Sequence, residues 1–297
     1  MAIFKRLIQI CIAKLFAIFL IIATGCSQLY FHPETALLGT PDEIDLTYEP
    51  IIVQQQNREL AGWYLPASTT YSGSLLFYHG NAGNISYHLG FVHWLPAAGY
   101  DVYLYDYQGY GESSGSVSID KAVSDVLVML EHTQTHIKQQ HQTNYRLSLY
   151  GHSLGGSLLA SALPQAQATG LLAEVDNIVI DSSFSDYRLI AREKMQQLWL
   201  TRYLRWPLGW LFPAQPKPVE DVKALQTMPL LIMHSPEDQV VPFNHGQALF
   251  DAATTSTKYF YPLADPRHNH GFQYPEDRLV FLKFLQSSQI RTTLNAQ

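Results

Sequence analysis

Cysteine is almost absent from the 297-residue sequence: Cys11 and Cys26 are the only two, and both lie near the N-terminus. The rest of the chain can therefore hold no thiol nucleophile, no cysteine-ligated zinc and no iron–sulfur cluster. The sequence also has no run of basic residues, and its formal net charge is −6. A chain with this charge balance is a poor candidate for binding the phosphate backbone of a nucleic acid.

A long uninterrupted apolar run is missing too. The N-terminal stretch carries Lys5, Arg6 and Lys14 and no acidic residue, and its clean apolar run covers only residues 15–23. This run is too short to span a bilayer comfortably. A charged start, a short apolar stretch and small residues before a break are typical of a secretory signal.

The small residues of this stretch end in "ATGC", which resembles a bacterial lipoprotein signal. The resemblance implies that residues 1–25 are removed and that Cys26 is lipidated, so that residues 26–297 form a membrane-anchored domain in the cell envelope. The mature domain would then contain no free thiol and no disulfide, which an envelope location permits but does not require. The alternative is an uncleaved membrane anchor that starts near Leu7.

Short apolar runs recur along the rest of the chain: "SLLFYHG", "DVYLYDYQG", "RLSLYGHS", "NIVIDSS" and "PLLIMHS". Runs that are apolar on both faces indicate buried parallel strands. Helix-length stretches at 119–140 and 154–167 lie between them, and two earlier strands are predicted in 44–54 and 59–67. This alternation predicts an α/β fold, with a mostly parallel central sheet and helices on both faces. Ligands bind such sheets beyond the carboxyl ends of the strands.

One of these strand ends carries the pentapeptide G-x-S-x-G, at Gly151–Gly155. In a nucleophile elbow the serine lies on a sharp strand-to-helix turn, and its neighbours are small because the helix crosses close to the strand. The predicted strand before Ser153 and the helix-compatible run after it supply that context. Ser153 is therefore the candidate nucleophile, and the alternative is an ordinary turn serine.

A serine hydroxyl needs a base, and the base needs an orienting acid. In this fold the acid and then the histidine follow the serine along the chain. Glu237 and Asp238 follow one later strand, and His268 and His270 follow the last one. The two histidines could also suggest a metal pair, but no third group of ligands is apparent, so no metal site is predicted.

The oxyanion of a tetrahedral intermediate needs two backbone N–H donors. One is expected from Leu154, the residue after the nucleophile. The other is expected from the loop after an earlier strand, and "FYHGNAGN" fits that loop with Asn81 as the donor.

These motifs together resemble the α/β-hydrolase superfamily, and within it the α/β-hydrolase-domain-containing serine hydrolases that carry a serine aminopeptidase-like domain. The matching stretches are "HGNA", "DYQGYGESSG", "GHSLGG", "HSPEDQVVPFNHGQALF" and "RHN", and the likeness runs from about Tyr30 to the C-terminus. The family spacing from His234 selects Asp238 as the acid. His268, which precedes Asn269, is selected as the base.

The segment at about 183–225 is longer than a simple crossover and rich in tryptophan. It is predicted to form a small helical lid whose Trp199, Trp206 and Trp210 line an acyl-binding cleft. Two alternatives stay open: a lid that packs on the core without touching substrate, and shallow contact with a membrane surface.

The sequence thus predicts an envelope serine hydrolase that cleaves carboxylic esters or thioesters through an acyl-enzyme, with small-molecule or lipid acyl substrates and no cofactor. A serine peptidase is the rival enzyme, although no clear acidic cluster is present to hold a peptide amino terminus. A non-catalytic envelope binding protein is the rival of another class, and the complete triad argues against it. The fold alone does not decide between these functions.

Overall fold

The computed structural model describes residues 31–55, 58–142, 145–197, 203, 206, 214–269 and 272–295. The predicted signal and the lipidation site Cys26 lie outside these residues. Across the part of the chain that is described, no helix combines the length and apolar character needed to cross a membrane.

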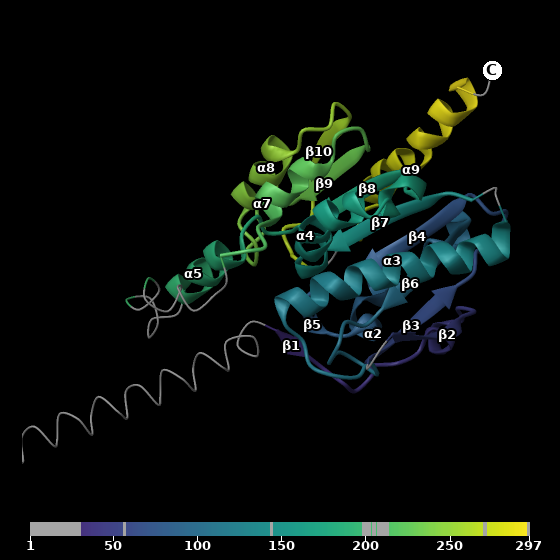
Figure 1. The fold of residues 1–297 in the computed structure, drawn as a ribbon, viewed down its shortest axis with the longest axis horizontal. Helices are drawn as coiled ribbons and strands as arrows, with labels where there is room; N and C mark the ends of the chain where they lie inside the picture. The colour runs from purple at the N-terminus through teal and green to yellow at the C-terminus, as the bar shows by residue number, and fades with distance from the viewer. Residues whose placement is uncertain are drawn as a thin grey trace, which may run out of the picture.

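An eight-stranded sheet forms the centre of the molecule, in the order β10-β9-β8-β7-β4-β6-β3-β2 (Figure 1). The five strands from β9 to β6 in this order are buried along their whole length, as their continuous apolar runs predict. The strands are β2 (Glu49–Gln55), β3 (Arg58–Leu65), β4 (Gly73–Tyr78), β6 (Tyr100–Tyr105), β7 (Leu147–His152), β8 (Asn177–Asp181), β9 (Leu230–His234) and β10 (Lys258–Pro262).

The strands from β6 to β10 all run parallel, while β2 and β3 pair antiparallel and β3 pairs antiparallel with β6. The parallel arrangement brings the carboxyl ends of β4, β7, β8, β9 and β10 to one edge of the sheet. The loops after these strands carry the predicted site residues. This architecture confirms the predicted α/β fold with a mostly parallel central sheet.

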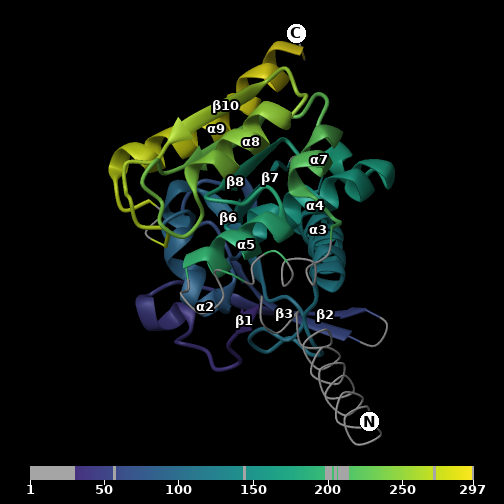
Figure 2. The ribbon, with the colours of Figure 1, turned by 90° about the vertical axis from the view of Figure 1, so that its left-hand side faces the viewer.

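Helices cover both faces of the sheet, as predicted. Figure 2 shows α3, α4 and α7 on the opposite side of the sheet from α9 and α2. Alternate side chains of strands β4, β7 and β8 enter two separate cores. Leu76, Leu149 and Ile180 join the core under α3 and α4. Phe77, Tyr150 and Val179 join the core that includes side chains of α9. The helices are α2 (Ile85–His88), α3 (Ile119–His141), α4 (Leu154–Ala168), α5 (Tyr187–Gln197), α7 (Pro218–Asp221), α8 (Phe243–Ala252) and α9 (Pro275–Asn295).

The strand predicted over 44–54 starts later than expected, at Glu49. Residues Pro41–Ile44 form a short 3-10 helix instead, because Thr40 and Glu43 make a reciprocal capping box and proline fits the first helical position. Ahead of this turn the chain contributes a strand that the sequence did not suggest. This strand, β1 (His32–Pro33), pairs in parallel with β5 (Ala82–Gly83), in the loop after β4.

Candidate active site

Ser153 lies between the end of β7 and the first residue of α4, in the strand–turn–helix context that the sequence predicts. Its backbone has φ 54° and ψ −117°, a conformation that costs a non-glycine residue on the order of 1–3 kcal/mol. The backbone N–H of Ser153 donates to the carbonyl of Asp181 on the neighbouring strand at 2.8 Å, which holds the turn. The strained turn presents the hydroxyl at the carboxyl edge of the sheet.

The glycines around the serine are required by close backbone contacts. A Cβ at Gly155 would lie 2.0 Å from the carbonyl oxygen of Tyr78, and one at Gly151 would lie 2.5 Å from the Cα of Gly156. Neither contact is sterically possible, so helix α4 can cross β4 and β7 this closely only with glycine at both positions.

The structure brings the three predicted triad residues together. His268 Nε2 lies 2.8 Å from Ser153 Oγ, and His268 Nδ1 lies 2.7 Å from Asp238 Oδ2. The other carboxylate oxygen of Asp238 accepts the backbone N–H groups of Val240 and Val241, at 2.7 and 2.9 Å. The carboxylate is therefore fixed in place, and it holds the imidazole with one nitrogen toward the serine.

Electrostatics around the triad favour an ionised acid and a neutral base. Burial alone would raise the pKa of Asp238, but the hydrogen bond and charge of His268 and the N–H groups of Val241 and Val240 outweigh it and lower that pKa below its usual range. Burial lowers the pKa of His268, and Asp238 only partly opposes this effect. A neutral imidazole beside the serine hydroxyl is able to accept its proton.

The two predicted oxyanion donors follow the ends of two paired strands, β7 and β4. Leu154 is the first residue of α4, where backbone N–H groups have no acceptor within the helix. Asn81 lies in the loop between β4 and β5, and its side-chain Oδ1 accepts the His32 N–H at 3.0 Å and the Tyr110 hydroxyl at 2.8 Å. These bonds fix the loop, and the N-terminal segment supplies one of them.

A second histidine–aspartate pair lies beside the triad. His152 Nδ1 is 3.2 Å from Asp181 Oδ2, and this carboxylate also accepts hydroxyl groups from Tyr150 and Ser182, each at 2.8 Å. The ring centroids of His152 and His268 are 5.0 Å apart. Sequence reasoning did not select Asp181, and the available signal was its place at the carboxyl end of the strand next to β7.

Of the three tryptophans named from the sequence, Trp206 is the one that the structure describes. Trp206 is 59% exposed, and the guanidinium carbon of Arg192 lies 4.7 Å from the centroid of its ring. Trp199, Trp210 and His270 lie outside the described residues. Within the described part of the chain, no group of three or more histidine, cysteine and acidic side chains is placed to hold a metal ion.

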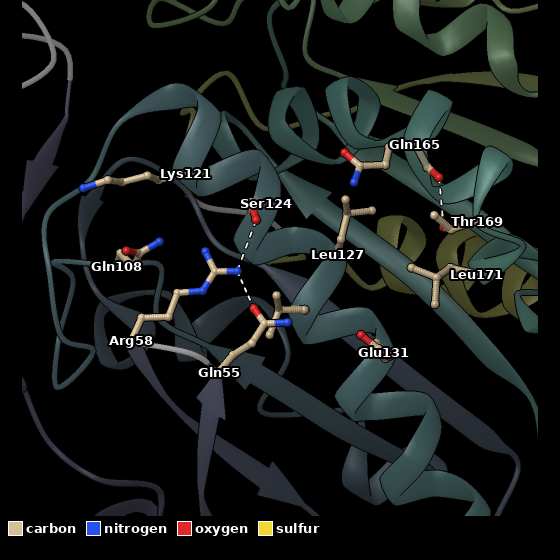
Figure 3. Close-up of a pocket in the computed structure, with 11 residues that line it drawn as sticks. Gln55, Arg58, Gln108, Lys121, Ser124, Leu127, Glu131, Gln165, Thr169 and Leu171 are labelled. Carbon is tan, nitrogen blue, oxygen red and sulfur yellow. Dashed lines mark hydrogen bonds between the residues drawn. The ribbon is translucent and has the colours of Figure 1, made fainter.

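A cavity of about 630 Å³ lies away from the triad, against α3 and the ends of β3 and α4, and Figure 3 shows its lining. The two cationic groups there have partners: Arg58 donates to Asp125 Oδ1 at 2.9 Å and to Ser124 Oγ at 3.1 Å, and Lys121 donates to Ser116. No triad residue lines this cavity. A smaller cavity, of about 300 Å³, includes the residue after Asn81 and the residue after His268 in its lining.

Comparison with known protein families gives a match to the model described as Serine aminopeptidase, S33, over residues 70–217. Among curated proteins, the uncharacterized protein YfhR of Escherichia coli O157:H7 is 27% identical over 269 residues, covering 86% of each chain. The lysophosphatidylserine lipase ABHD12 of Danio rerio is 26% identical over 245 residues, covering 76% of this chain and 62% of the lipase.

Solved structures show the same fold. An esterase of Pyrococcus furiosus superposes with a TM-score of 0.68 at 18% identity, covering 87% of this chain and 97% of the esterase. A soluble variant of the Saccharomyces cerevisiae monoglyceride lipase, in complex with a substrate analog, gives a TM-score of 0.60 at 15% identity, covering 86% and 98% of the two chains.

Proposed function

Because this chain belongs to the α/β-hydrolase family of serine hydrolases, we propose that it hydrolyses carboxylic esters through an acyl-enzyme on Ser153. The observation that carries the proposal is the continuous hydrogen-bonded chain from Ser153 Oγ through His268 to Asp238. Esterases and lipases among the similar proteins support the choice of an ester bond. A thioester is the next candidate, and an amide of the aminopeptidase type is the third.

In the proposed reaction, Ser153 Oγ attacks the carbonyl carbon while its proton passes to His268 Nε2. The backbone N–H groups of Asn81 and Leu154 receive the oxyanion. The carbon–oxygen bond to the alcohol then breaks, and the alcohol oxygen takes the proton from His268. Water attacks the acyl-enzyme, its proton passes through His268 back to Ser153 Oγ, and the carboxylic acid leaves.

The test uses the full chain in detergent and a fluorophosphonate probe. The probe is expected to label the wild type, and Ser153→Ala is expected to abolish both labelling and ester hydrolysis while the thermal unfolding transition remains. Labelling that survives this substitution would contradict the assignment of the nucleophile. Parallel assays with an ester, a thioester and an aminoacyl amide of matched acyl groups rank the three candidate bonds.

The tryptophan-rich segment is proposed to contribute to an acyl cleft. Each methylene that the cleft buries should then add up to about 0.8 kcal/mol to transition-state binding, so kcat/KM should rise with acyl length up to the size of the cleft. Trp206→Ala should flatten that rise and leave acetyl esters nearly unaffected. A flat profile in the wild type would favour membrane contact for these side chains, which the exposure of Trp206 also allows.

Lipidation at Cys26 and an envelope location remain proposals from the sequence. Labelled palmitate should enter the protein in cells, and Cys26→Ser should remove it. His32 lies six positions after Cys26, and a trans peptide chain of six Cα–Cα steps reaches at most about 22 Å. A lipid at Cys26 would thus hold β1, and the loop it pairs with, near the membrane surface.

A further inference from the structure

The cavity of about 300 Å³ that is lined by Ala82 and Asn269 has no role in the reaction described above. It is lined by Ala82 and Gly83 of β5, by Asn269, and by His32 and Glu34 of the N-terminal segment. Its volume is at the lower end of the range for small-molecule sites. The rings of Tyr87 and Phe91 complete its wall, so it joins aromatic surface to a single carboxylate.

The position of the cavity follows from the two motifs that border it. Ala82 directly follows Asn81, the proposed oxyanion donor, and Asn269 directly follows His268, the proposed base. In acyl transfer the histidine returns its proton to the leaving oxygen, so the leaving alcohol must lie next to the histidine. The cavity is lined by the residue after the proposed base and by the residue after the proposed oxyanion donor, although neither of those two residues lines it, so we assign it to the side of the leaving alcohol. This step rests on the proposed function.

The outer wall of the cavity is held by backbone hydrogen bonds. The Glu34 N–H donates to the Gly83 carbonyl at 3.1 Å, and the Glu34 carbonyl accepts the Gly111 N–H at 3.0 Å and the Asn84 side-chain amide at 2.9 Å. Figures 1 and 2 both show β1 beside α2, the helix that carries Tyr87. The position of Glu34 at the cavity is thus set by its backbone on both sides.

The charge at the cavity is negative. Glu34 is exposed and contributes a carboxylate, one oxygen of which, Oε1, accepts the Ala36 N–H at 3.3 Å. None of the residues that line this cavity is lysine or arginine. Burial and the neighbouring histidines keep the pKa of His88 well below its usual range, so its ring adds no positive charge. A carboxylate accepts hydrogen bonds from hydroxyl groups and repels a phosphate.

We propose that this cavity is the subsite for the leaving alcohol and that Glu34 makes it select an uncharged polyhydroxy alcohol, of the glycerol type, over an alcohol that carries a phosphate. The hydroxyl groups of the alcohol donate to the Glu34 carboxylate, and its C–H surface lies against Tyr87 and Phe91. The ABHD12 relative is named as a lysophosphatidylserine lipase, and the alcohol of that lipid carries a phosphate, so the selection proposed here is different.

The experiment compares three esters of one fatty acid in the same mixed detergent micelles: the monoacylglycerol, the lysophosphatidic acid and the methyl ester. The full chain should prefer the monoacylglycerol to the lysophosphatidic acid by roughly tenfold or more in kcat/KM, because a hydrogen bond to a charged group is replaced by a repulsion. Glu34→Gln should reduce this ratio, and Glu34→Lys should abolish or reverse it. Hydrolysis of the methyl ester should change by less than about twofold, because methanol has no group that reaches Glu34.

Asp42→Lys is the matched control, since it makes the same charge change at another exposed acid of the N-terminal segment, outside the lining of this cavity. It should leave the preference for monoacylglycerol intact. An equal effect of Asp42→Lys and Glu34→Lys would show a general charge effect and overturn the subsite. An unchanged ratio in Glu34→Lys would overturn it as well. Absence of hydrolysis of all three esters would instead contradict the proposed function.

A second measurement uses only the wild type. The acyl-enzyme formed from the methyl ester can pass its acyl group to an added alcohol, whose O–H proton goes to His268 as the new ester bond forms. The bond between the acyl carbon and Ser153 Oγ then breaks, and Oγ takes the proton from His268. Glycerol should compete with water and yield monoacylglycerol, and glycerol 3-phosphate at equal concentration should yield at least severalfold less product. Equal transfer to both acceptors would overturn the selection. If choline accepts the acyl group in preference to glycerol, the Glu34 carboxylate binds a cationic alcohol, and the proposed selection of an uncharged alcohol is wrong.

Discussion

The pair His268–Asp238 and the pair His152–Asp181 lie next to each other at the carboxyl edge of the sheet, and each joins an imidazole Nδ1 to a buried carboxylate. They differ in what surrounds the second imidazole nitrogen. His268 Nε2 faces Ser153 Oγ at 2.8 Å. His152 Nε2 is buried and has no hydrogen-bond partner among the described residues, and its ring lies against Phe91 with centroids 4.2 Å apart.

The two carboxylates are also held by different groups. Asp238 lies in a loop and accepts backbone N–H groups, whereas Asp181 ends a central strand and accepts the hydroxyl groups of Tyr150 and Ser182. The first arrangement leaves an imidazole at the reacting serine, and the second joins side chains within the core. The comparison teaches that a histidine–aspartate contact is not in itself a catalytic arrangement. Whether such a pair can act in catalysis depends on which group the second imidazole nitrogen contacts.

The largest difference between the two pairs is expected when each imidazole is removed. His268→Ala should lower kcat by roughly four to six orders of magnitude, because the serine loses its base. His152→Ala should keep kcat within about tenfold of the wild type, since the serine keeps its base, and should cost roughly 2–4 kcal/mol of unfolding free energy from the cavity it leaves. Steady-state kinetics and chemical denaturation of both variants test this. Equal losses of kcat would remove the distinction between the pairs.

Neutralising each of the two carboxylates should give the next largest difference between the pairs, in kcat and in stability. Asp238→Asn is expected to lower kcat by roughly 10⁴-fold, because the amide no longer stabilises the required tautomer and the imidazolium. Asp181→Asn is expected to act mainly on stability, at a cost of roughly 2–4 kcal/mol, because its donors lose a charged acceptor. If Asp181→Asn matches Asp238→Asn in kcat with intact folding, Asp181 has a catalytic role that the hydrogen bonds do not indicate.

The pH dependence of kcat/KM tests how strongly each carboxylate acts on the pKa of His268. Burial places the pKa of His268 below its usual range, and activity should rise with pH through that pKa because the base must be neutral. Both carboxylates favour the imidazolium, so removing either should lower this pKa and move the acid limb of kcat/KM to lower pH. The shift should be larger for Asp238→Asn than for Asp181→Asn, because Asp238 holds the ring directly. A limb that moves to higher pH in either variant would contradict this electrostatic account.

The smallest effect is expected at His270, which belongs to neither pair and lies outside the described residues. His270→Ala should change kcat by less than about twofold, because a single imidazole can serve Ser153 and His268 takes that place. The variant therefore serves as the control for His268→Ala. A loss comparable with that of His268→Ala would reassign the base.

Much of the fold and of the candidate site is readable in local sequence. The helices predicted over 119–140 and 154–167 occur at Ile119–His141 and Leu154–Ala168, because their apolar and small residues agree with the packing they meet. The elbow is predictable because G-x-S-x-G stands between a strand-like run and a helix-compatible run, which is the context that a nucleophile elbow requires. The acid and the base followed from family spacing, and the structure brings both to the serine.

The remaining features depend on contacts between distant segments. The strand β1 has two residues and no apolar pattern, and it exists only because its backbone pairs with a loop fifty residues away. Asp181 ends one apolar strand and Asp238 follows another, so the hydrophobic pattern alone does not show which carboxylate reaches His268, and Asp238 was selected only by its family spacing. That choice is made by the order of strands in the sheet and the path of the loop after β9.

By itself, therefore, the sequence determined the elements, their order and the chemical groups at the strand ends, because hydrophobic periodicity and small-residue turns act over a few residues. Only the tertiary structure decided which groups meet: which imidazole nitrogen faces the serine, and which acid lines the cavity beside it. Hydrogen bonds form only between groups within about 3 Å of each other, and that proximity is set by packing across the whole chain.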